Sequence, residues 1–381
     1  MKLKLPDHQL YENHINPIEL ADWLTHTNNL TRSILQNLEP GQEFVPKDDV
    51  LNPPYWEFAH LTWFHEFWVH RHGQVTMPSF IVNSDYLFNS SDVAHTDRWS
   101  LEMPSLTALL DYNAKVVDKT LDLLKDTMDA ETAYFIKLPI FHQDMHNEAF
   151  AYMWQTLGYK EPFKAFSRAA SNQQASKHIN FPDSSIKLGS ESQNGFIFDN
   201  EKWAHVIDVP AFDISVRAVS NAEYLEFIES EANRSDPFPV AIPKHWKKQD
   251  GIWYQRFFNQ WVALNDLEPV RHINLIDAKR YCEWRGLRLP TEQELSVLMS
   301  HPQNEWCASD LWEWTSSPFL PFPGFSPDPY LDYSKPWFDG NYQVLKGWSV
   351  YTPERMRRPA FRNFYAPQRN DHFCGFRTCL L

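Results

Sequence analysis

The sequence contains little that would suit an extracellular, disulfide-stabilised or membrane-spanning protein. Its 381 residues include four cysteines, too few for a disulfide framework in a chain of this size. No stretch approaches 18 apolar residues without a charge, so no membrane span is expected. The first residues, beginning Met1-Lys2-Leu3-Lys4, lack the apolar segment of a signal peptide. We therefore expect a soluble, cytoplasmic protein that does not bind membranes.

The chain is also poor in positive charge. Its formal net charge is −14 at pH 7, which disfavours binding to nucleic acids. Aromatic residues, in contrast, make up 15% of the chain, and this richness excludes disordered, collagen-like and coiled-coil proteins. Small molecules are the expected partners, and the sequence carries no signal for an oligomeric state.

Glycine is scarce in the first half, where the segments with helical periodicity are long. They predict four helices, at about residues 18–38, 53–73, 106–125 and 131–157. The second begins at a proline pair and closes at Gly73, and the fourth closes at Gly158, as helices often do. Pro139 should either begin the main part of the fourth helix or kink it. Four helices with short or medium connections predict a helical bundle over residues 1–165.

The second half has a different texture. Residues 166–193 are polar and rich in serine, which predicts a linker. From residue 194 onward the chain changes to short apolar runs and many turns. Capping boxes at Ser220–Glu223 and Thr291–Glu294 predict two short helices, and a third should span about 277–285 and end at Gly286. The expected fold class is α+β, with the helical bundle followed by a mixed domain over residues 194–381.

Two histidines at helical spacing are the clearest chemical signal. His142 and His146 are four residues apart on the fourth predicted helix, so their rings lie on one face and could bind a single metal ion. A third candidate lies on the second helix, in an apolar stripe that should be buried. This stripe consists of Trp56, His60, Trp63, Phe64 and Phe67.

The buried position of His60 has two interpretations: a core histidine with one hydrogen bond, or a metal ligand contributed by a second helix. Three imidazole ligands would leave half of an octahedral site open. His65, His70 and His72 lie off the stripe, and we expect them in solvent.

Motifs in both halves resemble those of the ergothioneine sulfoxide synthase family. In the first half they are Asn52–Glu66, with its proline pair and His60, and His142–Glu148. The second half contributes Arg288-Leu289-Pro290-Thr291-Glu292, Leu311-Trp312-Glu313-Trp314-Thr315, Phe361-Arg362-Asn363-Phe364 and Gly375-Phe376-Arg377-Thr378. The resemblance covers nearly the whole chain in order, and the segments Ser91–Ser100 and Phe141–Ala149 are most similar to the selenoneine synthase branch. It implies a DinB-like four-helix bundle followed by a C-type-lectin-like, formylglycine-generating-enzyme-like domain.

The resemblance implies an enzyme with a non-haem Fe(II) cofactor, held here by His60, His142 and His146. Such oxidoreductases use O₂ to join a thiol or selenol to C2 of the imidazole of hercynine, which is Nα-trimethylhistidine. Three protein ligands, the imidazole, the donor and O₂ make six coordination positions. Neutral histidine ligands leave the site cationic, which favours an anionic sulfur or selenium donor.

The resemblance also implies contacts with the substrates. Asn363 would hold the hercynine carboxylate beside Phe364, and Arg98 would bind the carboxylate of the donor. Met145 stands where the family often has glutamine. Because these residues come from both halves, the active site is expected between the two domains. Further aromatic candidates for a pocket around the trimethylammonium group are Trp312, Trp314 and Trp348.

Two departures from the family concern the donor. Phe322 stands where the family has a proton-donating tyrosine, so the catalytic proton donor is left unassigned. Tyr365 stands where an aspartate binds γ-glutamyl-cysteine, although a shift of a few positions would bring Asp371 there. A buried charge without a partner is costly. We therefore expect a donor other than γ-glutamyl-cysteine, with a selenosugar favoured and cysteine second.

Other functions were weighed against this one. Within the family, the alternative is a hercynine or histidine sulfoxide synthase that uses cysteine or γ-glutamyl-cysteine. A formylglycine-generating enzyme needs a reactive cysteine pair, and Cys374 and Cys379 have its spacing but lie at the C-terminus. Thiol transferases with a DinB bundle hold Zn²⁺ with three histidines but lack a second domain. The alternative of another class is a non-catalytic, lectin-like binding module on the bundle.

Overall fold

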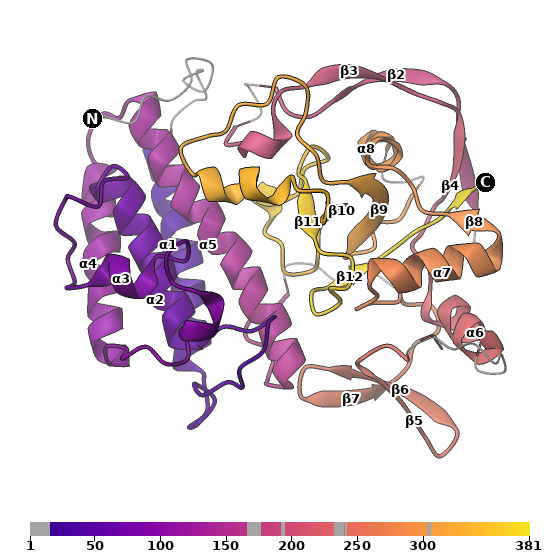
Figure 1. Cartoon of the computed structure of the whole chain (residues 1–381), viewed down its shortest axis with the longest axis horizontal. Coiled ribbons are helices and arrows are strands. Elements are labelled where there is room, and N and C mark those ends of the chain that lie inside the picture. Colours follow the sequence, from indigo (N-terminus) through magenta and orange to yellow (C-terminus); the bar gives the residue numbers. More distant parts are fainter. Residues whose placement is uncertain (1–15, 166–176, 192–194, 232–239, 241, 303–305) are drawn as a thin grey trace. The chain divides into compact units, whose positions relative to one another are not determined.

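A computed structural model describes residues 16–165, 177–191, 195–231, 240, 242–302 and 306–381. The chain divides into two compact units. Unit 1 comprises Met1–Met153, Ser192–Ile197 and Asp328–Asp332, and unit 2 comprises Trp154–Glu191, Phe198–Pro327 and Tyr333–Leu381. Helices dominate the first unit and sheets the second (Figure 1), which confirms the predicted α+β class. None of the helices in the described residues is both long and apolar enough to cross a membrane.

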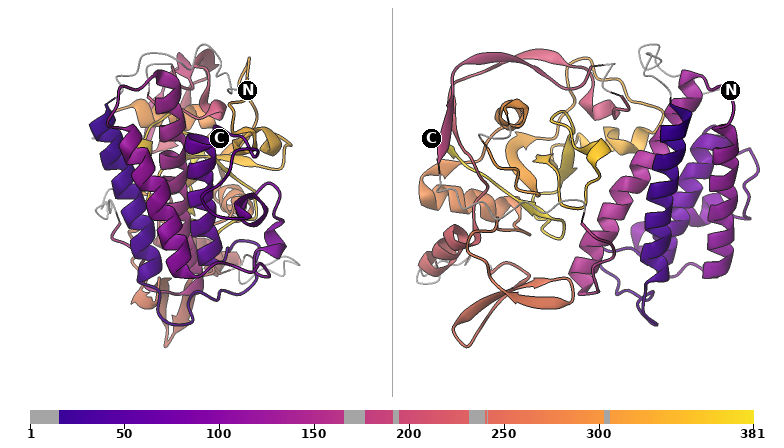
Figure 2. Two further views of the ribbon diagram at one scale, coloured as in Figure 1. Left: turned by 90° about the vertical axis from the view of Figure 1, so that its left-hand side faces the viewer. Right: turned by 180° about the vertical axis from the view of Figure 1, so that it is seen from behind.

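Unit 1 is built on four helices that run side by side (Figure 2). They are α1 (Pro17–Gln36), α2 (Pro54–His65), α4 (Leu106–Leu123) and α5 (Ala130–Leu157), so the four predicted helices are confirmed. The helix α5 runs through Pro139, and its last turn belongs to unit 2. Between α2 and α4 lie a π-helical segment (Glu66–His70), α3 (Ser84–Phe88) and a 3-10 turn (His95–Asp97).

Buried polar side chains join these helices to one another. The hydroxyl of Thr31 on α1 donates to Asn147 Oδ1 on α5 at 2.7 Å, and Asn147 Nδ2 donates back to Thr27 Oγ1 at 2.9 Å. On α4, Asn113 Nδ2 donates to Asn28 Oδ1 on α1 at 2.9 Å. Since hydrogen bonds in a dry interior demand matched partners, these contacts fix the relative register of the helices.

The helix α2 lies in the middle of the bundle rather than at its surface. Eleven of its twelve residues are buried, and it packs against α1, α3 and α4. The expectation that His65 and His70 lie in solvent is therefore wrong: they are 4% and 8% exposed, and both rings bond Thr120 Oγ1. A central helix has no solvent face, and the π-helical turn after His65 changes the periodicity. His72 is exposed, as predicted.

Unit 2 contains two four-stranded sheets among the described residues. The first has the order β1 (His178–Phe181), β4 (Phe212–Ser215), β13 (Cys379–Leu380) and β8 (Leu287–Arg288). The second has the order β11 (Asn363–Tyr365), β10 (Gln343–Gly347), β9 (Trp312–Pro318) and β12 (Cys374–Gly375). The pair β9–β12 is parallel and the other pairs are antiparallel.

Smaller sheets complete this unit. One pairs β2 (Ser184–Leu188) with β3 (His205–Val209), and the other joins β5 (Trp246–Gln249), β6 (Ile252–Phe257) and β7 (Gln260–Ala263). Two of the strands, β1 and β2, fall in the segment predicted as a linker over 166–193. Part of that segment, 166–176 and 192–194, lies outside the described residues. The strands form because Ile179, Phe181, Ile186 and Leu188 alternate with polar residues and bury one side of each strand.

The three short helices predicted for unit 2 are present: two begin where the capping boxes indicate, and the third begins at Leu275 rather than at about 277. They are α6 (Asn221–Glu231), α7 (Leu275–Arg285) and α8 (Glu292–Ser300). A capping box opens α8, where the Glu294 N–H donates to Thr291 Oγ1 at 3.2 Å. The helix α7 ends at Arg285 and is capped by Gly286, whose φ of +68° suits glycine.

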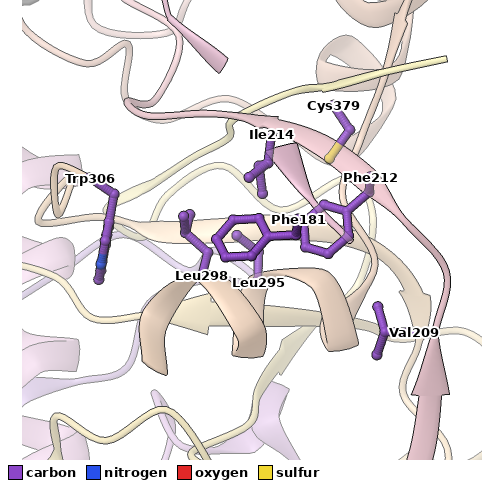
Figure 3. Close-up of a cluster of buried hydrophobic side chains, with 8 residues drawn as sticks. All are labelled: Phe181, Val209, Phe212, Ile214, Leu295, Leu298, Trp306 and Cys379. Carbon is purple, nitrogen blue, oxygen red and sulfur yellow. The ribbon is translucent and has the colours of Figure 1, made fainter. Parts of the chain in front are cut away.

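One core of unit 2 lies between α8 and the strands β1 and β4. Leu295 and Leu298 extend from α8 toward Phe181, Phe212 and Ile214 (Figure 3). All five side chains are at most 8% exposed, so this apolar contact holds the helix against the sheet.

Candidate metal centre

Three histidines converge inside unit 1. His60 on α2 and His142 and His146 on α5 each offer one ring nitrogen, and these three atoms lie within 4.8 Å of one another. The ring centroids of His142 and His146 are 4.5 Å apart, and that of His60 lies 5.4 and 5.5 Å from them. His60 and His142 are buried, and His146 is half-buried. The spacing of four residues on α5 and the buried face of α2 thus produce one cluster.

Hydrogen bonds orient two of the rings. His60 Nδ1 donates to the Phe88 carbonyl oxygen at 2.8 Å, and His146 Nδ1 bonds Glu57 Oε1 at 2.8 Å. A carbonyl can only accept, so His60 carries its proton on Nδ1 and keeps the lone pair of Nε2. The third ring has a buried Nδ1 that finds no hydrogen-bond partner among the described residues. Two oriented rings beside a buried ring nitrogen without a hydrogen-bond partner are the arrangement expected of metal ligands.

Burial sets the charge of the cluster. It lowers the pKa of His60 to about 3, with a further effect from His146. It also lowers the pKa of His142 well below the usual value, and the other two histidines add to this shift. Both rings are therefore neutral at pH 7. Neutral imidazoles suit divalent iron, zinc, copper or nickel, and three of them leave coordination positions open.

Aromatic rings form the walls of this cluster. Trp56 stacks on His60 with centroids 5.2 Å apart and planes within 2°. Phe64 stacks on His142 at 3.8 Å. Tyr330 lies edge-on to both Phe64 and His142, at 4.9 and 6.0 Å. Three residues of the predicted stripe, Trp56, His60 and Phe64, thus lie at the cluster, whereas Phe67 of the same stripe is half-buried.

Two side chains at this site escaped the sequence analysis. Tyr330 comes from the segment Asp328–Asp332, which belongs to unit 1 although it lies far along the chain. Its short Pro-Asp-Pro-Tyr context carries no periodicity that could assign it to the bundle. Glu57 is 1% exposed and carries a second carboxylate oxygen, Oε2, without a partner in the described part of the chain. A lone acid in an apolar helix, three residues before His60, was the signal that could have identified it.

Arg98 lies next to Trp56, the ring that stacks on His60. Its guanidinium carbon is 3.9 Å from the centroid of the Trp56 ring, and its Nη1 donates to Asn52 Oδ1 at 2.8 Å. Its Nε is buried and has no partner within the residues described here. Burial lowers the pKa of Arg98, and the carboxylate of Glu57 opposes this effect. Met145, also predicted to contact substrate, is half-buried on α5 next to His146.

The other predicted substrate residues belong to unit 2. Asn363, Phe364 and Tyr365 form β11, at the edge of its sheet. The Asn363 side chain accepts a hydrogen bond from the Phe364 N–H at 2.9 Å, which is a local contact. Phe364 stacks on Phe319 at 3.9 Å, and Tyr365 stacks on His372 at 3.9 Å. All three residues of β11 are half-buried.

Several other candidates of unit 2 are buried. Phe322 is 8% exposed, and its ring lies 4.1 Å from the Arg362 guanidinium. Trp312 and Trp314, which were expected to line a pocket, are 2% and 0% exposed and belong to the buried core of unit 2. Asp371, the alternative to Tyr365, is buried and binds Arg369 through both carboxylate oxygens.

The two C-terminal cysteines do not form a reactive pair. Cys374 lies in β12 and Cys379 in β13, strands of different sheets, and both thiols are free and buried. Burial raises the pKa of both, that of Cys379 to about 12. Protonated, buried thiols are poor nucleophiles, which argues against the chemistry of a formylglycine-generating enzyme.

Known proteins resemble both halves of the chain. The sequence profile of the DinB superfamily matches residues 24–154, and that of the sulfatase-modifying factor enzyme 1-like domain matches residues 162–309. The chain is 27% identical to the hercynine oxygenase of Mycolicibacterium smegmatis, over 94% of this chain and 97% of that protein. The corresponding enzyme of Mycobacterium tuberculosis is 26% identical, over 95% and 98%. Ergothioneine biosynthesis protein 1 of Schizosaccharomyces pombe is 31% identical, over 45% of this chain and 26% of that protein.

Proposed function

Because the chain joins a DinB superfamily domain to a sulfatase-modifying factor enzyme 1-like domain and has hercynine oxygenases as homologues over nearly its full length, we propose that it is a C–Se or C–S bond-forming synthase. Its substrates are hercynine, a selenol or thiol donor and O₂, and its cofactor is Fe(II). The C2–H bond of hercynine and the Se–H or S–H bond of the donor break, and a C–Se or C–S bond forms. O₂ accepts four electrons, with one oxygen atom kept on selenium or sulfur and the other released as water.

One observation carries this proposal: the convergence of His60, His142 and His146 within 4.8 Å. These residues would hold the iron through neutral nitrogens, and a bound ferrous ion would activate O₂ and gather both organic substrates at one centre. Glu57 holds the ring of His146 by its hydrogen bond to Nδ1. Trp56 and Phe64 exclude water from the sides of His60 and His142.

Tyr330 is the side chain to which we assign the transfer of a proton. Phe322, at the position where the family has its proton-donating tyrosine, has no hydroxyl. Tyr330 instead lies edge-on to His142 within unit 1. Burial, with a smaller effect from Asp332, raises its pKa. The phenol therefore keeps its proton on Oη at pH 7 and can donate it to a substrate atom held beside His142.

The proposed donor is a selenosugar rather than γ-glutamyl-cysteine. A dipeptide with an ammonium group needs an anionic partner, and Asp371 is already bound by Arg369 through both of its oxygens. Tyr365 has a neutral hydroxyl where the family has an anionic aspartate, which suits a neutral sugar. Arg98 keeps its buried Nε–H as a donor for an oxygen atom of a substrate, since that atom has no partner among the described residues.

The test is a donor panel. Protein loaded anaerobically with Fe(II) and hercynine is mixed with O₂ and with a selenosugar, cysteine or γ-glutamyl-cysteine, and the adducts are identified by mass. We expect the highest kcat/KM with the selenosugar. A tenfold preference for γ-glutamyl-cysteine, about 1.4 kcal/mol of transition-state stabilisation, would overturn the choice of donor but not the synthase. Absence of an adduct with all three donors would reject the synthase in favour of a binding module.

A further inference from the structure

The segment Asp328–Asp332 is a detached piece of unit 1. It is separated by some 130 residues from the preceding stretch of that unit, Ser192–Ile197, yet belongs to it with the helices α1, α2, α4 and α5. Prolines precede and follow Asp328, which restricts this part of the segment to an extended conformation. A 3-10 turn, Leu331–Tyr333, begins directly after Tyr330. We name residues 328–332 the strap.

The strap contacts the bundle at three places. At one end, the Tyr134 hydroxyl donates to Asp328 Oδ2 at 3.1 Å, and this bond is buried. At the other end, the exposed hydroxyl of Ser91 donates to Asp332 Oδ2. Between them, Tyr330 packs edge-on against Phe64 and His142. The hydrogen bonds of Asp328 and Asp332 therefore anchor the segment on both sides of Tyr330 in the chain.

The helix α5 carries both Tyr134, which bonds the strap, and two of the three histidines. Tyr134 precedes His142 by eight residues on α5, which is about two turns along the helix and about 80° around its axis. A strap residue that bonds Tyr134 is thereby placed about two turns from His142, on an adjoining part of the helix surface. Ser91, in the loop after α3, belongs to the segment Ser91–Ser100, for which a role was expected of Arg98 but none of Ser91.

We propose that the strap seats Tyr330 against His142, and that Tyr134 and Asp328 are positioning residues for its hydroxyl, with Ser91 and Asp332 as a weaker second tether. Neither Tyr134 nor Asp328 is one of the three converging residues. Their effect passes through Tyr330. This inference rests on the proposed function for its kinetic consequence, but the placement of the strap can be tested without any reaction.

The kinetic test is a double-mutant cycle on the iron-loaded enzyme with hercynine and the best donor. We expect Tyr330→Phe to lower kcat about 100-fold and Tyr134→Phe to lower it about tenfold, with KM changed less than twofold in Tyr134→Phe. If Tyr134 acts through the hydroxyl of Tyr330, adding Tyr134→Phe to Tyr330→Phe should cause no further loss. A further tenfold loss in the double variant would overturn the proposal, because Tyr134 would then act by another route.

The structural test is limited proteolysis of the metal-free protein with chymotrypsin, followed by mass analysis. Tyr330 is protected when seated, so cleavage after residue 330 should be slow in the wild type and at least fivefold faster in Tyr134→Phe and Asp328→Asn. Ser91→Ala is the matched variant at the exposed end and should accelerate cleavage less. Equal cleavage rates in all four proteins would refute the strap. Co²⁺ affinity should be unchanged in Tyr134→Phe, and a tenfold loss would show that the tether supports the histidines instead.

Neither result depends on the other. If the wild type forms no adduct but Tyr134→Phe accelerates cleavage after residue 330, the strap stands and the proposed function fails. If the wild type forms an adduct and the cleavage rates are equal, the function stands and the strap fails.

Discussion

Each unit has, within its described residues, a trio of buried or half-buried histidines, and the two trios are chemically different. In unit 1, His60, His142 and His146 bring their ligand atoms within 4.8 Å. In unit 2, His245, His272 and His372 are 3%, 2% and 0% exposed, and the first two rings lie 4.7 Å apart. Among the described residues, the trio of unit 1 is the one group of three potential ligands that converges in this way. Burial and proximity of histidines therefore do not by themselves make a metal site.

The difference lies in the partners of the rings. His60 donates from Nδ1 to a carbonyl, which leaves a lone pair on Nε2. In unit 2, His245 Nδ1 faces a donor, Arg256 Nη2, at 3.0 Å. A ring whose Nδ1 accepts must carry its proton on Nε2, so that nitrogen cannot bind a metal. The ring nitrogen of His146 bonds a buried carboxylate, Glu57, whereas that of His245 bonds an arginine. The first of these two contacts favours a nearby cation and the second disfavours it.

The largest expected effect is the loss of metal from unit 1. His142→Ala removes one of three converging ligands, so the metal content after anaerobic loading should fall from one iron per chain to a trace, and activity should fall with it. His60→Ala and His146→Ala should behave alike. Elemental analysis of the desalted proteins measures this. Full iron in the His142→Ala protein would contradict the assignment of the trio.

Acid should affect the two trios in the same direction. The folded-state pKa is about 3 for both His60 and His272, against about 6.5 in the unfolded chain. The unfolded chain binds more protons between these values, so stability is fully present above pH 6.5 and is lost as pH falls toward 3. Each group contributes up to about 1.4 kcal/mol per pH unit. Chemical denaturation of the metal-free protein at pH 7, 6 and 5 gives the slope of the unfolding free energy against pH. In His60→Ala and in His272→Ala this slope should be smaller by about one proton. Unchanged slopes would contradict the buried, neutral state of these rings.

Much of this comparison was accessible from the sequence. Periodicity predicted the four helices, and the spacing of His142 and His146 with the stripe around His60 predicted three histidines in one core. Local capping signals, such as Thr291 with Glu294, predicted the short helices of unit 2. These features succeeded because they depend on residues within one or two helical turns of each other.

Features set by distant residues were not accessible. The burial of His65 is an exception, because α2 is apolar on nearly all sides and such helices are typically buried. Tyr330 reaches His142 through chain folding over almost 190 residues, without a periodic pattern. The strands β1 and β2 are four and five residues long, and so short an alternation in a polar segment resembles a linker. The ring partners that separate the two trios, Glu57 and Arg256, are likewise tertiary contacts.

A smaller effect should come from the partner of His146. Glu57→Gln keeps a hydrogen-bond acceptor for Nδ1 but removes the negative charge, and outer partners of this kind contribute about tenfold or more to metal affinity. We expect Co²⁺ to bind about tenfold more weakly, as followed by its visible absorption. Glu231→Gln, at a buried glutamate of unit 2, is the matched control and should not change the affinity. Equal affinities in all three proteins would mean that the charge of Glu57 has no influence on the ion.

The smallest effect concerns the trio that should bind no metal. His272 has a φ of +63°, a conformation that costs a residue with a Cβ atom about 1 kcal/mol. Its ring packs against His245 and Phe373, at 4.7 and 5.2 Å between centroids. His272→Ala and His272→Gly both remove these contacts, but glycine also relieves the backbone. The Gly variant should therefore be about 1 kcal/mol more stable than the Ala variant, measured by chemical denaturation. Both variants should retain one iron per chain, because the ring that they lack belongs to the trio whose nitrogens do not converge. A loss of iron in both variants would mean that the second trio also binds metal. A loss of stability without a loss of iron is the result expected for a buried histidine with a structural role.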